Sequence, residues 1–172
     1  MKNKSTAVKA AAYREAAQYA SAFLDDLHPD YATIVGREIR DGWRCIRRLR
    51  NNRPDDFDLN GLSAEETVSI EKEIVAIIAG VVAEEKIGTV KRHRRHDHKD
   101  YKYAVRLAKK ATGSHAEIGP FISWLTVRAE EFAEDLWFVI TALANELLLK
   151  KSIEKPEADQ IILQAIRGPK VH

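Results

Sequence analysis

Apolar residues recur at helical spacing along most of the chain, and this pattern predicts an all-helical protein. The first helix is expected over residues 6–27, where alanines and larger apolar side chains share one face. Because proline disfavours helical backbone at the preceding residue, His28-Pro29 ends this helix. A second helix is expected to begin at Asp30, a favourable N-cap, and to continue to about residue 50.

A central helix follows a loop that is rich in turn-forming residues. Residues 51–62 carry proline, glycine, asparagine and aspartate, which are typical of loops. Ser63-Ala-Glu-Glu66 then matches a capping box, in which the serine and the glutamate each satisfy a backbone amide of the other. The helix that it opens is apolar nearly all round, as expected of a buried central helix, and Gly88 bends or ends it.

Three further helices are expected in the second half of the chain. The first covers residues 101–111, and a long helix begins at residues 114–120 and continues to about residue 151. Trp137 stands between Leu136 and Phe138 in this long helix, so we expect its side chain to be buried. A short helix over residues 156–167 completes the chain. The pattern therefore predicts an all-α, single-domain bundle of five or six helices over residues 1–172.

Composition places the chain among ordinary globular proteins. The 172 residues are 45% hydrophobic, and the lone cysteine, Cys45, cannot form an internal disulfide. No apolar signal-peptide core follows the N-terminal lysines. The longest apolar stretch, residues 74–83, is shorter than the roughly 18 residues of a membrane span. We therefore expect a protein that is neither secreted nor membrane-bound, located in the cytoplasm or within a nucleoprotein particle.

The net charge of +2 hides a strong segregation of charge along the chain. Residues 35–53 hold seven arginines and two acids, for a net charge of +5. Residues 91–110 hold nine lysines and arginines and two acids, for a net charge of +7, and three histidines as well. Two basic segments are thus embedded in an otherwise acidic chain.

In a helical projection, each basic segment places its cations on one side. The first basic stripe falls within a sector of about 100° and consists of Arg37, Arg40, Arg44, Arg47 and Arg48. The second basic stripe has spacings of 3, 4, 3, 4 and 3 and consists of Arg92, Arg95, Lys99, Lys102, Arg106 and Lys109. Trp43, Tyr101 and Tyr103 border the stripes, where they could stack on bases or pack in the core.

Like charges at this spacing repel one another, so each stripe weakens its own helix. The stripes are therefore solvated faces, or they pair with acids such as Glu130, Glu131, Glu134 and Asp135, or they bind an anionic partner. Arginine binds phosphate bidentately, which favours nucleic acid over lipid as that partner. The leading hypothesis is a non-enzymatic protein without a cofactor that binds nucleic-acid backbone with little sequence preference. A homo-oligomer or a repeating coat, packaging or ribonucleoprotein subunit is compatible with it.

Two local resemblances define the enzymatic alternative. Arg92 and His98 fit the Arg-x(4–6)-His pattern and in this respect resemble HEPN ribonucleases, which implies polarisation and protonation of phosphate oxygens. Residues 129–147 resemble the second motif of MazG-type nucleoside triphosphate pyrophosphohydrolases, which implies Mg²⁺ binding by Glu131 and Glu134. The first MazG motif, Glu-x-x-Glu on the preceding helix, is absent. His93 and His96 lie one turn apart, a workable spacing for two metal ligands, although a fourth ligand is not evident.

Overall fold

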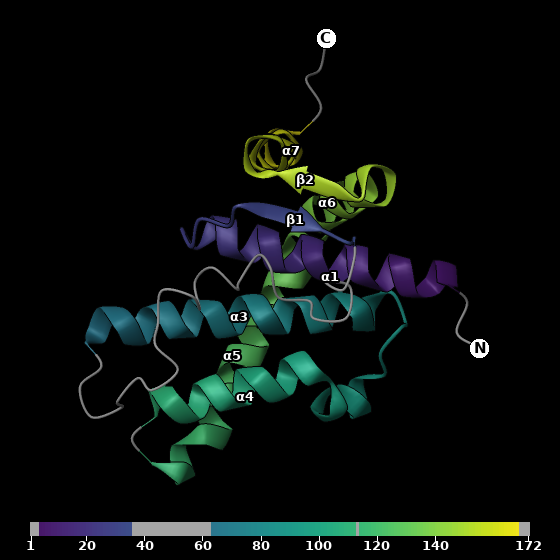
Figure 1. Cartoon of the computed structure of the whole chain (residues 1–172). Coiled ribbons are helices and arrows are strands. Elements are labelled where there is room, and N and C mark those ends of the chain that lie inside the picture. Colours follow the sequence, from purple (N-terminus) through teal and green to yellow (C-terminus); the bar gives the residue numbers. More distant parts are fainter. Residues whose placement is uncertain (1–3, 36–62, 113, 169–172) are drawn as a thin grey trace.

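The computed structural model describes residues 4–35, 63–112 and 114–168, and this part of the chain is an all-α bundle (Figure 1). Its α-helices are α1 (Lys4–Leu24), α3 (Ala64–Lys86), α4 (Lys99–Ala111), α5 (His115–Asp135), α6 (Trp137–Lys150) and α7 (Lys155–Arg167). A 3-10 helix, η3 (Arg92–Asp97), precedes α4, and two short strands, β1 (Tyr31–Thr33) and β2 (Ser152–Glu154), pair with each other. The predicted fold class is confirmed.

Helix α3 is the central element of the described bundle. It begins with the predicted capping box, in which the Ser63 hydroxyl accepts from the Glu66 amide at 3.1 Å and the Glu66 carboxylate accepts from the Ser63 amide at 2.8 Å. Buried residues surround the middle of α3, which packs against α1, α4 and α5. Figure 1 shows α1 and α4 on opposite sides of it. At Gly80 an added Cβ would lie 2.8 Å from the Gln18 side chain, so glycine allows α1 to approach closely.

The predicted second helix is wrong at its start. Residues Tyr31–Thr33 form β1 instead, antiparallel to β2, with Ala32 opposite Ile153. Both of these side chains are buried in the core, so pairing with a segment more than a hundred residues away overrides the local helical pattern. The rest of the predicted helix, residues 36–50, lies outside the described residues.

The predicted long helix is divided into α5 and α6 at Leu136, whose backbone angles, φ −113° and ψ 24°, are not helical. This break lets α5 pack against α3 while α6 packs against α1. The expectation that Trp137 is buried is also wrong. Its ring is partly exposed and stacks on Tyr13 with 5.4 Å between ring centroids. None of the described helices is long and apolar enough to cross a membrane.

Candidate functional site

The two basic stripes have different outcomes in the structure. The first basic stripe, Arg37 to Arg48, lies outside the described residues. The second basic stripe is described throughout, but it does not follow one helix. Its first two members lie on η3, and His98, with extended backbone at φ −67° and ψ 133°, separates them from the remainder on α4. Local sequence spacing therefore does not place all six cations on one face.

Arg95 is an internal structural residue. Its guanidinium is only 8% exposed and donates to both carboxylate oxygens of Glu85 at 2.6 Å and to Glu130 at 2.7 Å. These hydrogen bonds outweigh burial and raise the pKa of Arg95 above its usual value. Arg92 is 75% exposed, and it too donates to Glu130, at 2.9 Å. For these two arginines the structure shows pairing with acids of α3 and α5.

The remaining cations form a continuous exposed surface, which we call the α4 basic face. It contains every member of the second stripe that lies on α4 and also the adjacent Lys110, which the stripe pattern missed: Lys99, Lys102, Arg106, Lys109 and Lys110. Among the described residues, none of these five makes an ion pair with an acid. The one carboxylate within α4, Asp100, is buried beside Arg14, and Lys99 acts on it electrostatically without a described ion pair.

The inner side of α4 fixes how this face is presented. Tyr101, Ala104, Leu107 and Ala108 are buried, so they attach the helix to the core. The helix begins at His98, whose Nδ1 accepts a hydrogen bond from the Asp100 amide at 3.2 Å. These cations, which make no ion pair within the described part of the chain, thus stand on a helix that is packed on one side and capped at its start.

Two aromatic residues border the α4 basic face in different ways. Tyr101 is buried and meets the His96 ring edge-on at 5.0 Å, so it is a packing residue. Tyr103 is partly exposed, and the Arg106 guanidinium carbon lies 5.4 Å from its ring centroid. This arrangement holds Arg106 beside an aromatic surface at the centre of the basic face.

The structure separates the Arg92–His98 pair of the enzymatic alternative. Arg92 lines a hollow between η3, α3 and α5, whereas His98 lines a different cavity beside α1. Glu131 and Glu134 line the first of these hollows together with Glu85. The Glu85 carboxylate already forms an ion pair with Arg95, and Glu134 forms one with Lys86. Within the described ranges, no three His, Cys, Asp or Glu side chains are grouped so as to hold a metal ion.

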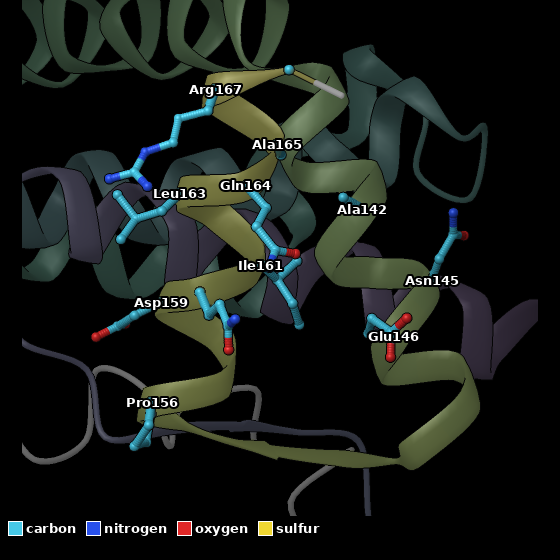
Figure 2. A pocket seen from close by; sticks show the side chains of 12 residues that line it. Ala142, Asn145, Glu146, Pro156, Asp159, Ile161, Leu163, Gln164, Ala165 and Arg167 are labelled. Atoms are coloured by element: carbon cyan, nitrogen blue, oxygen red, sulfur yellow. The ribbon is translucent and has the colours of Figure 1, made fainter. Parts of the chain in front are cut away.

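A groove of about 1060 Å³ lies between α6 and α7. Figure 2 shows Ile161 and Gln164 of α7 pointing toward α6, while Leu163 and Arg167 point to the other side of the helix. Asp159 in the groove wall accepts from the Tyr19 hydroxyl at 2.8 Å and from Lys155 at 2.8 Å. Its carboxylate is therefore engaged by the fold, and the groove shows no convergence of reactive groups.

Sequence patterns also missed a buried charged cluster between α1, α3 and the start of α4. Arg14 donates to Glu84 at 2.7 Å, and its Nε lies 3.8 Å from both Glu15 and Asp100. Burial would lower the pKa of Arg14, but the three surrounding carboxylates raise it. Burial raises the pKa of Glu15 to about 7 and also raises the pKa of Asp100. The only sequence signal for this cluster was the presence of charged residues on otherwise apolar helix faces.

Comparison of the sequence with protein-family models and with curated proteins finds no match.

Proposed function

We propose that this protein binds the phosphate backbone of nucleic acid through the α4 basic face and does not perform chemistry on it. The observation that supports the proposal is the contrast between two halves of one basic segment. Acids of the protein neutralise Arg92 and Arg95, while five cations on α4 have no ion-pair partner among the described residues. Such a face weakens its own helix unless an anion outside the protein binds to it.

The shape of α4 favours a polyanion with closely spaced charges. From Lys99 to Lys110 the helix rises about 16 Å, which corresponds to about five base steps of duplex DNA. A lipid surface suits the helix less well, because membrane-surface helices insert an apolar face. The apolar face of α4 is already buried against the rest of the protein. Phosphate contacts of this kind carry no sequence information, so little sequence preference is expected.

The first basic stripe remains part of the hypothesis as a prediction from sequence. Arg37, Arg40, Arg44, Arg47 and Arg48 would add phosphate contacts beyond those of α4. Arg95 no longer belongs to the proposed surface, because its guanidinium is buried and bound by two carboxylates. Arg92 is accessible but shares Glu130, so it is expected to contribute less than a residue of α4.

The test is fluorescence anisotropy with labelled duplex DNA, single-stranded DNA and RNA over a range of salt concentrations. The double variant Lys102→Ala/Arg106→Ala should weaken binding at least tenfold. It should also reduce the slope of log K against log salt by about 1.4 to 1.8, at 0.7 to 0.9 per phosphate contact. Arg94→Ala/Arg92→Ala is the matched control, since it removes the same charge from exposed residues that already pair with Asp97 and Glu130.

Two results would overturn the proposal. One is the absence of binding to any of the nucleic acids at about 50 mM salt, where backbone contacts are strong. The other is equal weakening by the α4 double variant and by its control, which would show that only net charge matters. Glu131→Gln should leave binding unchanged, and a loss of Mg²⁺-dependent nucleotide hydrolysis in that variant would instead favour the enzymatic alternative.

A further inference from the structure

A cavity of about 430 Å³ opens between the first turns of α1 and the loop after α3. Much of the cavity wall consists of small or apolar residues, namely Ala7, Ala10, Ala11, Gly88 and Val90. Polar side chains from three different elements converge on it: Arg14 of α1, Glu84 of α3 and His98 at the start of α4. The volume lies within the usual range for small-molecule sites, which are mostly apolar with a few convergent polar groups.

The Glu84 carboxylate connects the polar side chains of this cavity. It is only 6% exposed, and it accepts from Arg14 at 2.7 Å through Oε1 and from His98 at 3.2 Å through Oε2. An ionised carboxylate offers about four acceptor positions, so about two remain after these contacts. Glu84 therefore keeps the capacity to bind a further donor that enters the cavity.

The charge around Glu84 is unbalanced. Three carboxylates, those of Glu15, Glu84 and Asp100, surround the single guanidinium of Arg14. His98 joins the same cluster, with its Nδ1 accepting from the Asp100 amide and its Nε2 3.2 Å from Glu84. Buried charge is costly to maintain, and such clusters beside a cavity are characteristic of functional sites.

A further polar atom of the charged cluster lies outside the cavity lining. Asp100 is 1% exposed, and its Oδ1 has no hydrogen-bond partner within the described chain. An unpartnered buried carboxylate oxygen is unfavourable, and positive charge nearby would reduce the cost. The cluster therefore has both an excess of negative charge and an unused acceptor.

We infer that this cavity binds a small aliphatic amine, with its ammonium group against Glu84 and its alkyl chain along the alanine wall of α1. The open acceptor positions of Glu84 select a cation over an anion, and the apolar wall selects an alkyl chain over a fully hydrated metal ion. The site is distinct from the α4 basic face, and the inference does not depend on nucleic-acid binding.

The experiment follows backbone amide NMR shifts of the full-length ¹⁵N-labelled protein during titration with n-butylamine. A ligand this small is expected to bind with a Kd of about 1 mM. The shifts should saturate and centre on Gly88, Thr89 and His98, which line the cavity. The neutral n-butanol and the anionic butyrate, which match the amine in size, should bind at least tenfold more weakly.

Two substitutions separate binding in the cavity from general attraction to an acidic protein. Ala10→Leu narrows the cavity from a partly buried position and should abolish the saturable shifts, whereas Ala116→Leu on the exposed start of α5 should leave them unchanged. Glu84→Gln should reduce affinity for the amine at least tenfold. If Glu84→Gln does not fold, Ala10→Leu and the ligand comparison decide the outcome.

Three results would overturn the inference. They are the absence of saturable amine binding at about ten times the expected Kd, equal or tighter binding of butyrate, and unchanged amine binding in Ala10→Leu. Nucleic-acid affinity measured on Ala10→Leu should equal that of the unmodified protein, so failure here is distinguishable from failure of the proposed function.

Discussion

Arg95 is the residue that shows most clearly how partners decide the role of a charged side chain. In sequence it belongs to a basic stripe, yet its guanidinium holds η3 against α3 and α5 through Glu85 and Glu130. Neighbouring Arg92 shares Glu130 from a mostly exposed position. The two arginines are three residues apart, so they offer a matched pair for measuring the effect of burial.

Arg95→Ala should lower the free energy of unfolding by about 3 kcal/mol, because it leaves a largely buried Glu85 carboxylate without its partner. Arg92→Ala should lower it by less than about 1 kcal/mol, since exposed ion pairs contribute little. Urea unfolding of both variants tests this difference. Equal losses would show that the Arg95 contacts add no more than a surface pair.

Trp137 provides a second test at the scale of one side chain. A fully buried tryptophan would lose about 3 to 5 kcal/mol on truncation to alanine. Trp137 is half-buried and stacks on Tyr13, so Trp137→Ala should lose about 1 to 2 kcal/mol. Leu143→Ala, at a fully buried position of α6, should lose about 2 to 5 kcal/mol. Denaturant unfolding that ranks Trp137 above Leu143 would contradict the observed packing.

At the scale of an element, α4 combines two opposed demands. Its inner face stabilises the bundle by burying apolar side chains, while its outer face places like charges three and four residues apart. If this outer face serves binding rather than folding, a substitution that removes the repulsion between its charges should raise the stability of the protein.

Lys102→Glu tests this conflict directly. The new carboxylate would lie four residues before Arg106 and three after Lys99, which replaces repulsion by attraction. We expect the free energy of unfolding to rise by about 0.3 to 1 kcal/mol and nucleic-acid affinity to fall at least tenfold. Thermal unfolding and anisotropy measure the two effects. A variant that is both less stable and equally tight in binding would contradict the assigned role of this face.

At the scale of the whole molecule, the buried cluster makes stability depend on pH. Glu15 is buried beside Arg14 and Asp100, with Glu84 and Lys99 also acting on it, and its pKa is raised from 4.5 to about 7. The folded protein therefore holds this proton more tightly than the unfolded chain does. The contribution of Glu15 to the free energy of unfolding is therefore greatest below about pH 4.5 and falls as pH rises toward 7.

Chemical denaturation at several pH values should show this loss, of about 2 to 3 kcal/mol between pH 5 and 7.5. Asp100, whose pKa is also raised, changes stability in the same direction. Glu15→Gln keeps the shape of the side chain without the titration and should remove most of the decrease. Stability that rises with pH over this range in the unmodified protein would contradict the assignment.

Much of the fold could be predicted from the sequence because its signals are local. Helical spacing, the capping box at Ser63 and the proline and glycine boundaries are set by residues a few positions apart, and they identified α1, α3, α4 and α7 to within a few residues. The charge segregation was equally visible, and so were the exposed cations Lys99, Lys102, Arg106 and Lys109.

Tertiary structure alone decided which partners meet. Pairing of β1 with β2 displaced the start of a helix, and packing on two different helices divided α5 from α6 at Leu136. Arg95 became internal because the fold brings Glu85 and Glu130 to it, and Arg14, Glu84 and Asp100 meet across separations of 16 to 86 residues. An ion pair is strong only when its two groups lie a few ångströms apart. The local spacing of charged residues therefore cannot show which of them will pair with a carboxylate from a distant segment of the chain.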